Sequence, residues 1–351
     1  MSIDWKDVRR VLVVRLRSIG DTVLATPSLV ALRRHLPEVQ IDILLENWVA
    51  PLLDGFDRVD NVIRVGKSPA DRLKTALAIR RNKYDVVFNL HGGTTSTFFT
   101  RASGAPHRVG YRYYQYSAAY NHLLSSPSDF WKQERLHSAE QQLALLGFVG
   151  VPVEDRPKSQ LTVTQVANET INQKLEKSAI CNPQSAFAMI HPAAAFETKR
   201  WPIQQFAQAA EFLHEKGMTP VAVVSKSETT LLTDLASASK VPIVTFNDLS
   251  LPEITALASR AKIFFGNDSG IAHIAAAVGT PTVVVFGSSN RDHWRPWADF
   301  PNEVVFEAFD CQPCAGYECK VFGEPLCILQ IDPAKVFAAI ERVMSVNTRS
   351  E

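Results

Sequence analysis

Residues 263–278, which read IFFGNDSGIAHIAAAV, decide the fold. The mostly apolar run Ile263–Gly266 suits a short buried strand, and Gly270–Val278 suits a buried helix. Between them, Asn267–Ser269 forms a tight polar turn. This pattern predicts a strand that passes directly into a helix, which is the repeating unit of parallel α/β sheets.

The same alternation of short apolar runs and longer amphipathic runs extends over both halves of the chain. In the second half the expected elements are Phe187–His191, Ile203–Lys216, Pro220–Ser225, Glu228–Ser239, Ile243–Phe246, Pro252–Ala261, Ile263–Gly266, Gly270–Val278 and Pro281–Phe286. In the first half they are Val11–Leu16, Thr22–Leu36, Ile41–Leu45, Trp48–Leu53, Val62–Val65, Pro69–Arg81, Val86–Leu90 and Thr94–Arg101. Each half is expected to be an α/β domain with a parallel sheet.

A proline-containing, polar stretch, Val151–Ser185, separates the halves and holds one expected helix near 166–178. We expect domains at 1–170 and 171–351, the second with a cysteine-rich segment at 311–327 and a closing helix at 333–345. Ligands of open parallel sheets bind beyond the carboxyl ends of the strands, so two such sheets facing one another predict an interdomain cleft.

Composition excludes several classes of protein. The chain has 351 residues, 46% of them hydrophobic and 21% charged, which suits two globular domains and not a disordered chain. No tract approaches the ~20 apolar residues of a membrane span, and residues 1–10 have no apolar signal region, so we expect a cytoplasmic protein. The G-x-G-x-x-G and P-loop fingerprints are missing, which weakens dehydrogenase and NTPase interpretations.

Charge is uneven along the chain. Residues 1–150 hold 20 Lys and Arg against 14 Asp and Glu, whereas residues 151–351 hold 17 against 22. The basic first half would suit an anionic substrate or an anionic membrane face, although an uneven solvated surface explains it equally well. No basic run with interleaved aromatic residues appears, so nucleic acid is not expected.

The first candidate motif, Arg15–Thr22 (RLRSIGDT), directly follows the first expected strand. Asp21 could take a proton from an incoming hydroxyl as a general base. Alternatively, Asp21 caps the following helix, because Asp is a favoured N-cap residue. Thr26-Pro27 could itself begin that helix, which would leave Asp21 in a loop or in a separate first turn.

The second candidate motif, His191–Pro202 (HPAAAFETKRWP), runs from a strand end to a helix start. Lys199 and Arg200 could neutralise a diphosphate, the lysine as a point charge and the arginine as a fork. Trp201 is interpreted as a packing anchor in preference to a base-stacking platform.

The third motif is the polar turn after Ile263–Gly266. Free amides at Ser269 and Gly270, with a helix dipole behind them, predict an anion site. Asp268 would hydrogen-bond a ligand hydroxyl or, as would Ser269, cap the helix. His273 would face either the anion or the interior, and the interior is favoured.

Two further loops suit the walls of a cleft. In Asn89–Thr94, His91 could orient or deprotonate an acceptor, or be merely structural. Phe286–Asn290 follows the last strand and carries two serines.

Together these motifs resemble glycosyltransferase family 9, the heptosyltransferases, over nearly the whole chain. Val11–Asp21 resembles the amino-terminal motif of the family, Glu197–Pro202 its Lys-x-Trp-Pro element, and Gly266–His273 its nucleotide-sugar loop. The resemblance implies a GT-B fold of two facing Rossmann-like domains and inverting transfer of heptose from ADP-heptose. It also implies a lipopolysaccharide core acceptor and work at the inner-membrane surface.

The resemblance further assigns roles by position. Asp21 would be the base, in an acceptor site that we extend to Arg15, Arg17, Ser18, Gly20 and His91. Lys199, with Arg200, would hold the diphosphate, and Glu228 would contact the ribose. Asp268, Ser269 and Gly270 would bind heptose and phosphate, with His273 close by. No Asp-x-Asp motif is present, so we expect catalysis to need no metal or other cofactor.

Other functions remain open at this point. A family relative could use another nucleotide sugar or another acceptor. A nucleotide-sugar epimerase of GT-B shape would need base chemistry on the sugar but no acceptor, and a binding protein would show no turnover.

Cysteines cluster without an obvious reason. Cys311, Cys314, Cys319 and Cys327 have the spacing C-x2-C-x4-C-x7-C. Four thiolates could hold tetrahedral zinc or an iron–sulfur centre. The paired C-x2-C halves of a zinc ribbon are lacking and a cytoplasmic location disfavours disulfides, so reduced packing thiols are the favoured alternative.

Overall fold

The chain forms two compact units in the computed structural model, which describes residues 3–178, 185–314 and 316–347. The units are Met1–Thr162 and Val163–Glu351. The expected boundary at residue 170 would cut helix α7 (Gln165–Glu176), which packs against α10 (Leu251–Arg260) and lies wholly in the second unit.

The first unit is built on a sheet of parallel strands in the order β3-β2-β1-β4-β5-β6. The strands are β1 Arg10–Leu16, β2 Gln40–Glu46, β3 Asn61–Val65, β4 Val86–Asn89, β5 His107–Tyr111 and β6 His122–Leu124. After Arg10, every residue of β1 is buried. A parallel strand covered on both faces is expected to be an unbroken apolar run, which is what the sequence shows.

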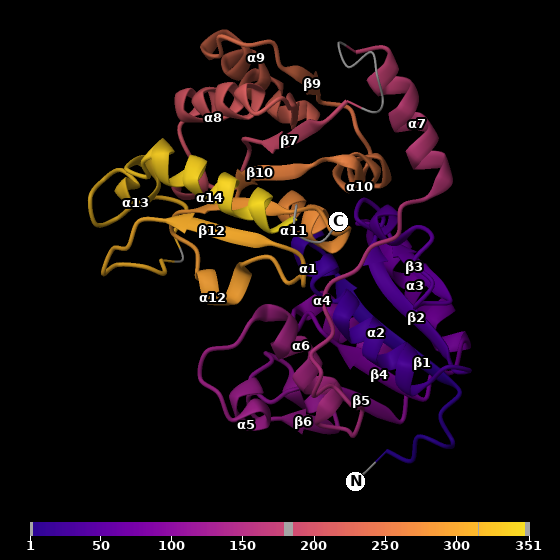
Figure 1. Cartoon of the computed structure of the whole chain (residues 1–351). Helices are drawn as coiled ribbons and strands as arrows, with labels where there is room; N and C mark the ends of the chain where they lie inside the picture. Colours follow the sequence, from indigo (N-terminus) through magenta and orange to yellow (C-terminus); the bar gives the residue numbers. More distant parts are fainter. Residues whose placement is uncertain (1–2, 179–184, 315, 348–351) are drawn as a thin grey trace. The chain divides into compact units, whose positions relative to one another are not determined.

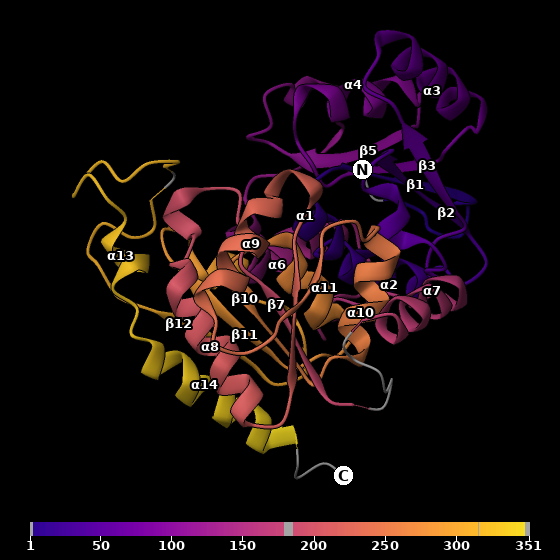
Figure 2. The same ribbon diagram turned by 90° about the horizontal axis from the view of Figure 1, so that it is seen from above.

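Two groups of helices pack on this sheet (Figure 2). Helix α4 packs on β1 and β4, and α3 on β3; α6 packs on β5 and also contacts α2 and α5. The helices are α1 Ile19–Val23, α2 Thr26–His35, α3 Pro69–Arg81, α4 Thr94–Ala102, α5 Pro127–Trp131 and α6 Ser138–Gly147, with 3-10 turns η1 Ala50–Leu53 and η2 Ser117–Ala119.

Several expectations for this unit were wrong in detail. The expected helix Thr22–Leu36 is interrupted before Thr26, and Trp48–Leu53 contains only the short turn η1. Strands β5 and β6 and helices α5 and α6 were not predicted. β6 has only three residues, so it carries too few positions for a periodic signal.

The second unit has a parallel sheet in the order β12-β11-β10-β7-β8-β9. Its strands are β7 Phe187–His191, β8 Thr219–Val223, β9 Val244–Phe246, β10 Ile263–Asn267, β11 Thr282–Phe286 and β12 Asn302–Phe306. The remaining helices are α8 Ile203–Glu215, α9 Thr229–Ala238, α11 Gly270–Ala277, α12 Arg291–Trp294, α13 Leu326–Leu329 and α14 Pro333–Asn347, with 3-10 turns η3 Glu197–Lys199 and η4 Lys226–Glu228.

Helices α8, α9 and α14 form one packed group in this unit, and α7, α10 and α11 form another (Figure 1). Beneath α8 lies an aromatic core in which the ring of Phe206 is 5.3 Å from that of Trp201 and 5.0 Å from that of Phe265. All three side chains are buried. No helix in the described part of the chain is long and apolar enough to cross a membrane.

Both sheets have the same topology. Counted from its own first strand, each sheet has the order 3-2-1-4-5-6 of a Rossmann domain. The expected α/β class with two Rossmann-like parallel sheets is confirmed. Strand order reverses between β1 and β4 in the first unit and between β7 and β10 in the second, and crevices at the carboxyl ends of such strands bind ligands.

The aromatic core makes a stability prediction. Phe206→Ala should lower the free energy of unfolding of the second unit by ~3–5 kcal/mol, because it leaves a cavity among buried rings. Val166→Ala, at a position that is 74% exposed on α7, should change it by less than ~0.5 kcal/mol. Denaturant unfolding followed by circular dichroism measures both, and a Phe206→Ala loss below ~1 kcal/mol would contradict the prediction.

Candidate functional site

A cation and a carboxylate meet at the reversal point of the first sheet. The register of β1 against β2 shifts between Val14 and Leu16, and Leu16 has φ of 53°, in the left-handed region. Between them, buried Arg15 forms an ion pair with Asp21 and donates a hydrogen bond to the carbonyl of Leu90. Arg15 therefore ties the loop after β1 to the loop after β4.

Asp21 is the third residue of the short helix α1, and the N-cap is Ser18. Its Oδ2 accepts hydrogen bonds from Ser18 Oγ at 3.1 Å and from Ser18 N at 3.4 Å. Ser18 is thus the N-cap, and Asp21 completes a capping box from the third helical position, so Asp21 lies in a separate first turn and caps that turn and not the longer helix α2. Its side chain is 24% exposed, so a ligand can reach the carboxylate.

Buried Asn89 holds the loop that carries His91. Asn89 Oδ1 accepts hydrogen bonds from the backbone amides of His91 at 3.0 Å and Gly92 at 2.9 Å, while Nδ2 donates to the Tyr120 hydroxyl at 2.7 Å. Gly92 has φ of 77°, and a Cβ there would lie 2.4 Å from the Tyr114 ring. The turn at Gly92 thus requires glycine.

His91 lies within electrostatic range of the Arg15–Asp21 pair. Burial lowers the pKa of its imidazole below 6.5, and the positive charge of Arg15 lowers it further. A neutral imidazole at pH 7 can accept or donate a proton in a hydrogen bond. Of the other predicted residues in this loop, Arg17 is exposed and Gly20 is buried in α1.

The second unit also joins a cation to a carboxylate where its strand order reverses. Lys199 Nζ lies 2.8 Å from Asp268 Oδ2, and Ser289 Oγ donates to the same oxygen at 2.5 Å. Asp268 follows β10, and Ser289 follows β11. The Asp268 side chain is 7% exposed and that of Lys199 is 20% exposed, so the lysine is the more accessible member of the pair.

Asn267, which is fully buried, fixes the segment that carries Lys199. Its Oδ1 accepts from the Trp201 amide at 3.1 Å and its Nδ2 donates to the carbonyl of Pro192 at 2.8 Å. Trp201 is 2% exposed, and its indole donates to the carbonyl of Ile331 at 3.1 Å. The interpretation of Trp201 as a packing anchor is confirmed.

Helix α11 begins two residues after Asp268. Its N-cap is Ser269, so the alternative in which Asp268 caps this helix is wrong. Gly270 is its first residue and His273 is buried one turn later. Ser269 Oγ is shielded from solvent and has no hydrogen-bond partner within the described residues.

Two residues that were predicted in the donor site, Arg200 and Glu228, form hydrogen bonds with groups other than Asp268. Arg200 Nε donates to the carbonyl of Ala194 at 2.8 Å. Glu228 Oε2 accepts from Ser225 Oγ at 2.6 Å and from Ser225 N at 3.2 Å, in a capping box. Neither interaction brings these side chains to Asp268.

Ser289 was missed as a site residue. The loop Phe286–Asn290 had been identified as a cleft wall, but its two serines are equivalent in the sequence. Ser288 Oγ instead donates to Thr198 Oγ1 at 2.8 Å. The path of the chain after β11 directs the Ser289 hydroxyl toward Asp268 and the Ser288 hydroxyl toward Thr198.

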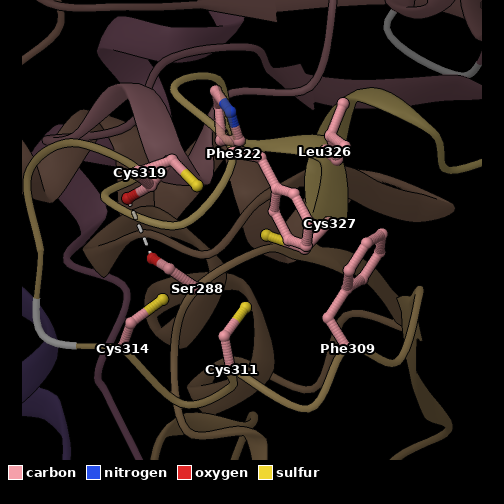
Figure 3. Close-up of a pocket in the computed structure, with 10 residues that line it drawn as sticks. Ser288, Phe309, Cys311, Cys314, Cys319, Phe322, Leu326 and Cys327 are labelled. Carbon is pink, nitrogen blue, oxygen red and sulfur yellow. Dashed lines mark hydrogen bonds between the residues drawn. The ribbon is translucent and has the colours of Figure 1, made fainter.

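The four clustered cysteines line one cavity in the second unit, together with Phe309 and Phe322 (Figure 3). All four are free thiols. Among residues 3–178, 185–314 and 316–347, no group of three or more His, Cys, Asp or Glu side chains is arranged so that it could hold a metal ion.

The environment of His91 makes a pH prediction. The imidazole should titrate with a midpoint below 6.5, measured by NMR and assigned by loss of the signal in His91→Gln. As pH falls, the imidazole of the unfolded chain is protonated before that of the folded chain, because its pKa is the higher of the two. Protonation therefore favours unfolding, so the contribution of His91 to stability is present above pH ~6.5 and is lost below it. A midpoint at or above 6.5 would contradict the burial argument.

The profile of glycosyltransferase family 9 (heptosyltransferase) matches residues 72–323. Lipopolysaccharide heptosyltransferase 3 of Escherichia coli is 25% identical over 95% of this chain and 98% of its own length.

Solved structures agree on the fold. The structure of E. coli ADP-heptose lipopolysaccharide heptosyltransferase II has a TM-score of 0.80 at 21% identity, covering 97% of this chain and 99% of that one. An E. coli heptosyltransferase solved with ADP has a TM-score of 0.72 at 19% identity, covering 95% and 99%. These structures share the GT-B type of fold with this protein. Since the family profile covers well over half of the sequence, the chain belongs to glycosyltransferase family 9, the heptosyltransferases.

Proposed function

We propose that this enzyme transfers heptose from ADP-heptose to a lipopolysaccharide core acceptor with inversion at the anomeric carbon. The observation that carries the proposal is the pair of switch-point sites: a reachable carboxylate, Asp21, in the first unit and the Lys199–Asp268 pair in the second. Relatives named as lipopolysaccharide heptosyltransferases support the substrate class.

Asp21 serves as the general base in this proposal. Its Oδ1 is paired with Arg15, while its Oδ2 accepts hydrogen bonds from the hydroxyl and the amide of Ser18. An acceptor hydroxyl that displaced the Ser18 hydroxyl could give its proton to that oxygen. Arg15 holds the carboxylate in position, and the neutral His91 nearby orients the acceptor.

The acceptor binds mainly to the first unit. The excess of Lys and Arg in residues 1–150 suits the acidic sugars and phosphates of a lipopolysaccharide core. An acceptor of this kind is anchored in lipid, so the enzyme works at the inner-membrane surface, from the cytoplasm.

The donor binds mainly to the second unit. An ammonium group has three donors, so Lys199 can keep its bond to Asp268 and still hold diphosphate oxygens. The Ser269 hydroxyl and the Ser269–Gly270 amides at the start of α11 add donors without charge. Asp268, already bonded by Lys199 and Ser289, accepts from a heptose hydroxyl.

Heptose transfer breaks the bond between the anomeric carbon and the diphosphate oxygen and forms one to the acceptor oxygen. The acceptor proton goes to Asp21, and the negative charge that develops on ADP is met by Lys199 and the α11 amides. This scheme routes no step of the transfer through a metal ion.

Asp21→Asn tests the base against a capping role. It should lower kcat by ~10²- to 10⁴-fold while ADP binding stays unchanged, because the amide cannot accept the proton. Asp71→Asn is the matched control: Asp71 is likewise the third residue of a helix, α3, and Oδ2 accepts from its N-cap Ser68 at 2.7 Å. If both variants kept near wild-type rates of ADP release with acceptor, Asp21 would not be the base.

Lys199→Gln tests the donor site. Loss of one charge-assisted hydrogen bond should weaken ADP binding by ~10- to 100-fold in calorimetry. Lys216→Gln removes an ion pair with Glu341 on the surface of the same unit and should leave the affinity unchanged. Equal affinities of Lys199→Gln and wild type would place the diphosphate elsewhere.

A further inference from the structure

Helix α3 turns two leucines toward solvent. Leu73 and Leu77, one helical turn apart, are 59% and 51% exposed, and no other leucine in the described part of the chain is more than half exposed. On the opposite face of the helix, Ala76 and Ile79 are buried in the core of the first unit. Single exposed leucines are ordinary in soluble proteins, but a pair on one helix face forms an apolar surface.

Cations surround this apolar surface. Residues 67–83 hold six Lys and Arg against a single acid, Asp71, so this short segment carries a net charge of +5 out of the net +6 of residues 1–150. Helical spacing places Lys74 and Arg81 on the same face as the two leucines, and both are exposed. Neither forms an ion pair with another described residue. The positive charge of the first half is therefore concentrated beside exposed leucines.

Helix α4 extends this surface. It packs beside α3, and both helices cover the same face of the first sheet (Figure 2). Phe98 of α4 is 46% exposed, and Arg101, three residues later, is exposed on the same side of the helix. Phe99, in contrast, is fully buried in the core beneath both helices. Two neighbouring helices thus direct apolar side chains and cations outward.

We propose that the outward faces of α3 and α4 dock on an anionic lipid bilayer. The leucines and Phe98 enter the boundary between headgroups and acyl chains, while Lys74, Arg81 and Arg101 pair with lipid phosphates. The aliphatic stems of lysine and arginine allow their charges to reach the headgroups from an apolar surface. A nucleic acid would pair with the cations but would leave the leucines in water. A bilayer accommodates both, and it needs no groove on the convex face of a helix.

The docking surface adjoins the proposed acceptor site. Helix α4 begins at Thr94, three residues after His91, and α3 begins at Pro69, four residues after β3 ends at Val65. Both helices therefore start at the carboxyl edge of the first sheet, the edge at which Asp21 lies. A bilayer against these helices would present a lipid-anchored acceptor near that edge, a consequence that rests on the proposed function.

Vesicle binding tests the surface without turnover. Full-length protein should co-sediment with phosphatidylcholine vesicles that contain about 30% phosphatidylglycerol, and it should bind vesicles of phosphatidylcholine alone at least ~10-fold more weakly. Added salt should weaken binding to the anionic vesicles, because it screens the attraction between cations and phosphates.

The leucines are tested by the double variant Leu73→Ser, Leu77→Ser. It should weaken binding to anionic vesicles by ~10-fold or more, because two side chains no longer transfer from water to the bilayer. Val166→Ser is the matched control, since Val166 is 74% exposed on α7 of the second unit, and it should bind as wild type does. Melting followed by circular dichroism should give similar curves for all of these proteins, because the changed residues are exposed.

The cations are tested by the double variant Lys74→Gln, Arg81→Gln. Loss of two charges near the surface should weaken binding to anionic vesicles by ~10- to 30-fold. Lys216→Gln, which removes an exposed charge from the second unit, should leave the affinity unchanged.

Two results would overturn the proposal. The first is binding of wild type to anionic vesicles that is no tighter than binding to neutral ones. The second is wild-type affinity in the leucine double variant, which would mean that the cations recognise phosphate without a bilayer. Transfer to a soluble, lipid-free acceptor should be equal in wild type and both double variants. No transfer to any acceptor, with vesicle binding intact, would count against the proposed function alone.

Discussion

Reversal of the strand order at the centre of each sheet is the constraint on which both sites depend. At β1 and β4, and again at β7 and β10, consecutive connections leave in opposite directions, so the loops after these strands separate and leave a crevice. The loop after β1 carries Asp21, and the segment after β7 carries Lys199. Each is tied to the loop after the neighbouring strand, by Arg15 in the first unit and by Asp268 in the second.

Both crevices balance a carboxylate with a cation and support the pair with a buried asparagine. Asn89 and Asn267 each end the fourth strand of their own sheet, each is fully buried, and the Oδ1 of each accepts a hydrogen bond from a backbone amide of the neighbouring segment. Burying an unpaired charge would strongly destabilise the folded protein, whereas burying a charge beside an opposite charge costs less free energy. The same solution in two domains follows from the same topology.

Sequence periodicity predicted the central strands and the long helices, because buried parallel strands are unbroken apolar runs. It missed β5, β6, β12, α5 and α6, among others. β6, with three residues, is too short to show a period, but the ten-residue α6 is not. At the site, Asp21, Lys199 and Asp268 all lie in segments that directly follow strands at the carboxyl edge of a sheet, although Asp21 is in the short helix α1 and Lys199 in the turn η3. The hydrogen bond of Ser289 to Asp268 depends on tertiary geometry, as does the capping box that occupies Glu228, so neither could be read from local sequence.

Long-range pairing within each unit has a consequence for how the chain folds during synthesis. Arg15 bonds to a carbonyl 75 positions away, and Asn267 to one at the same separation. Contacts this distant require most of a domain to have emerged before they form, and they slow folding relative to local helices. The amino-terminal unit can complete its own long-range contacts while the ribosome is still translating the second, so the first unit is expected to mature first.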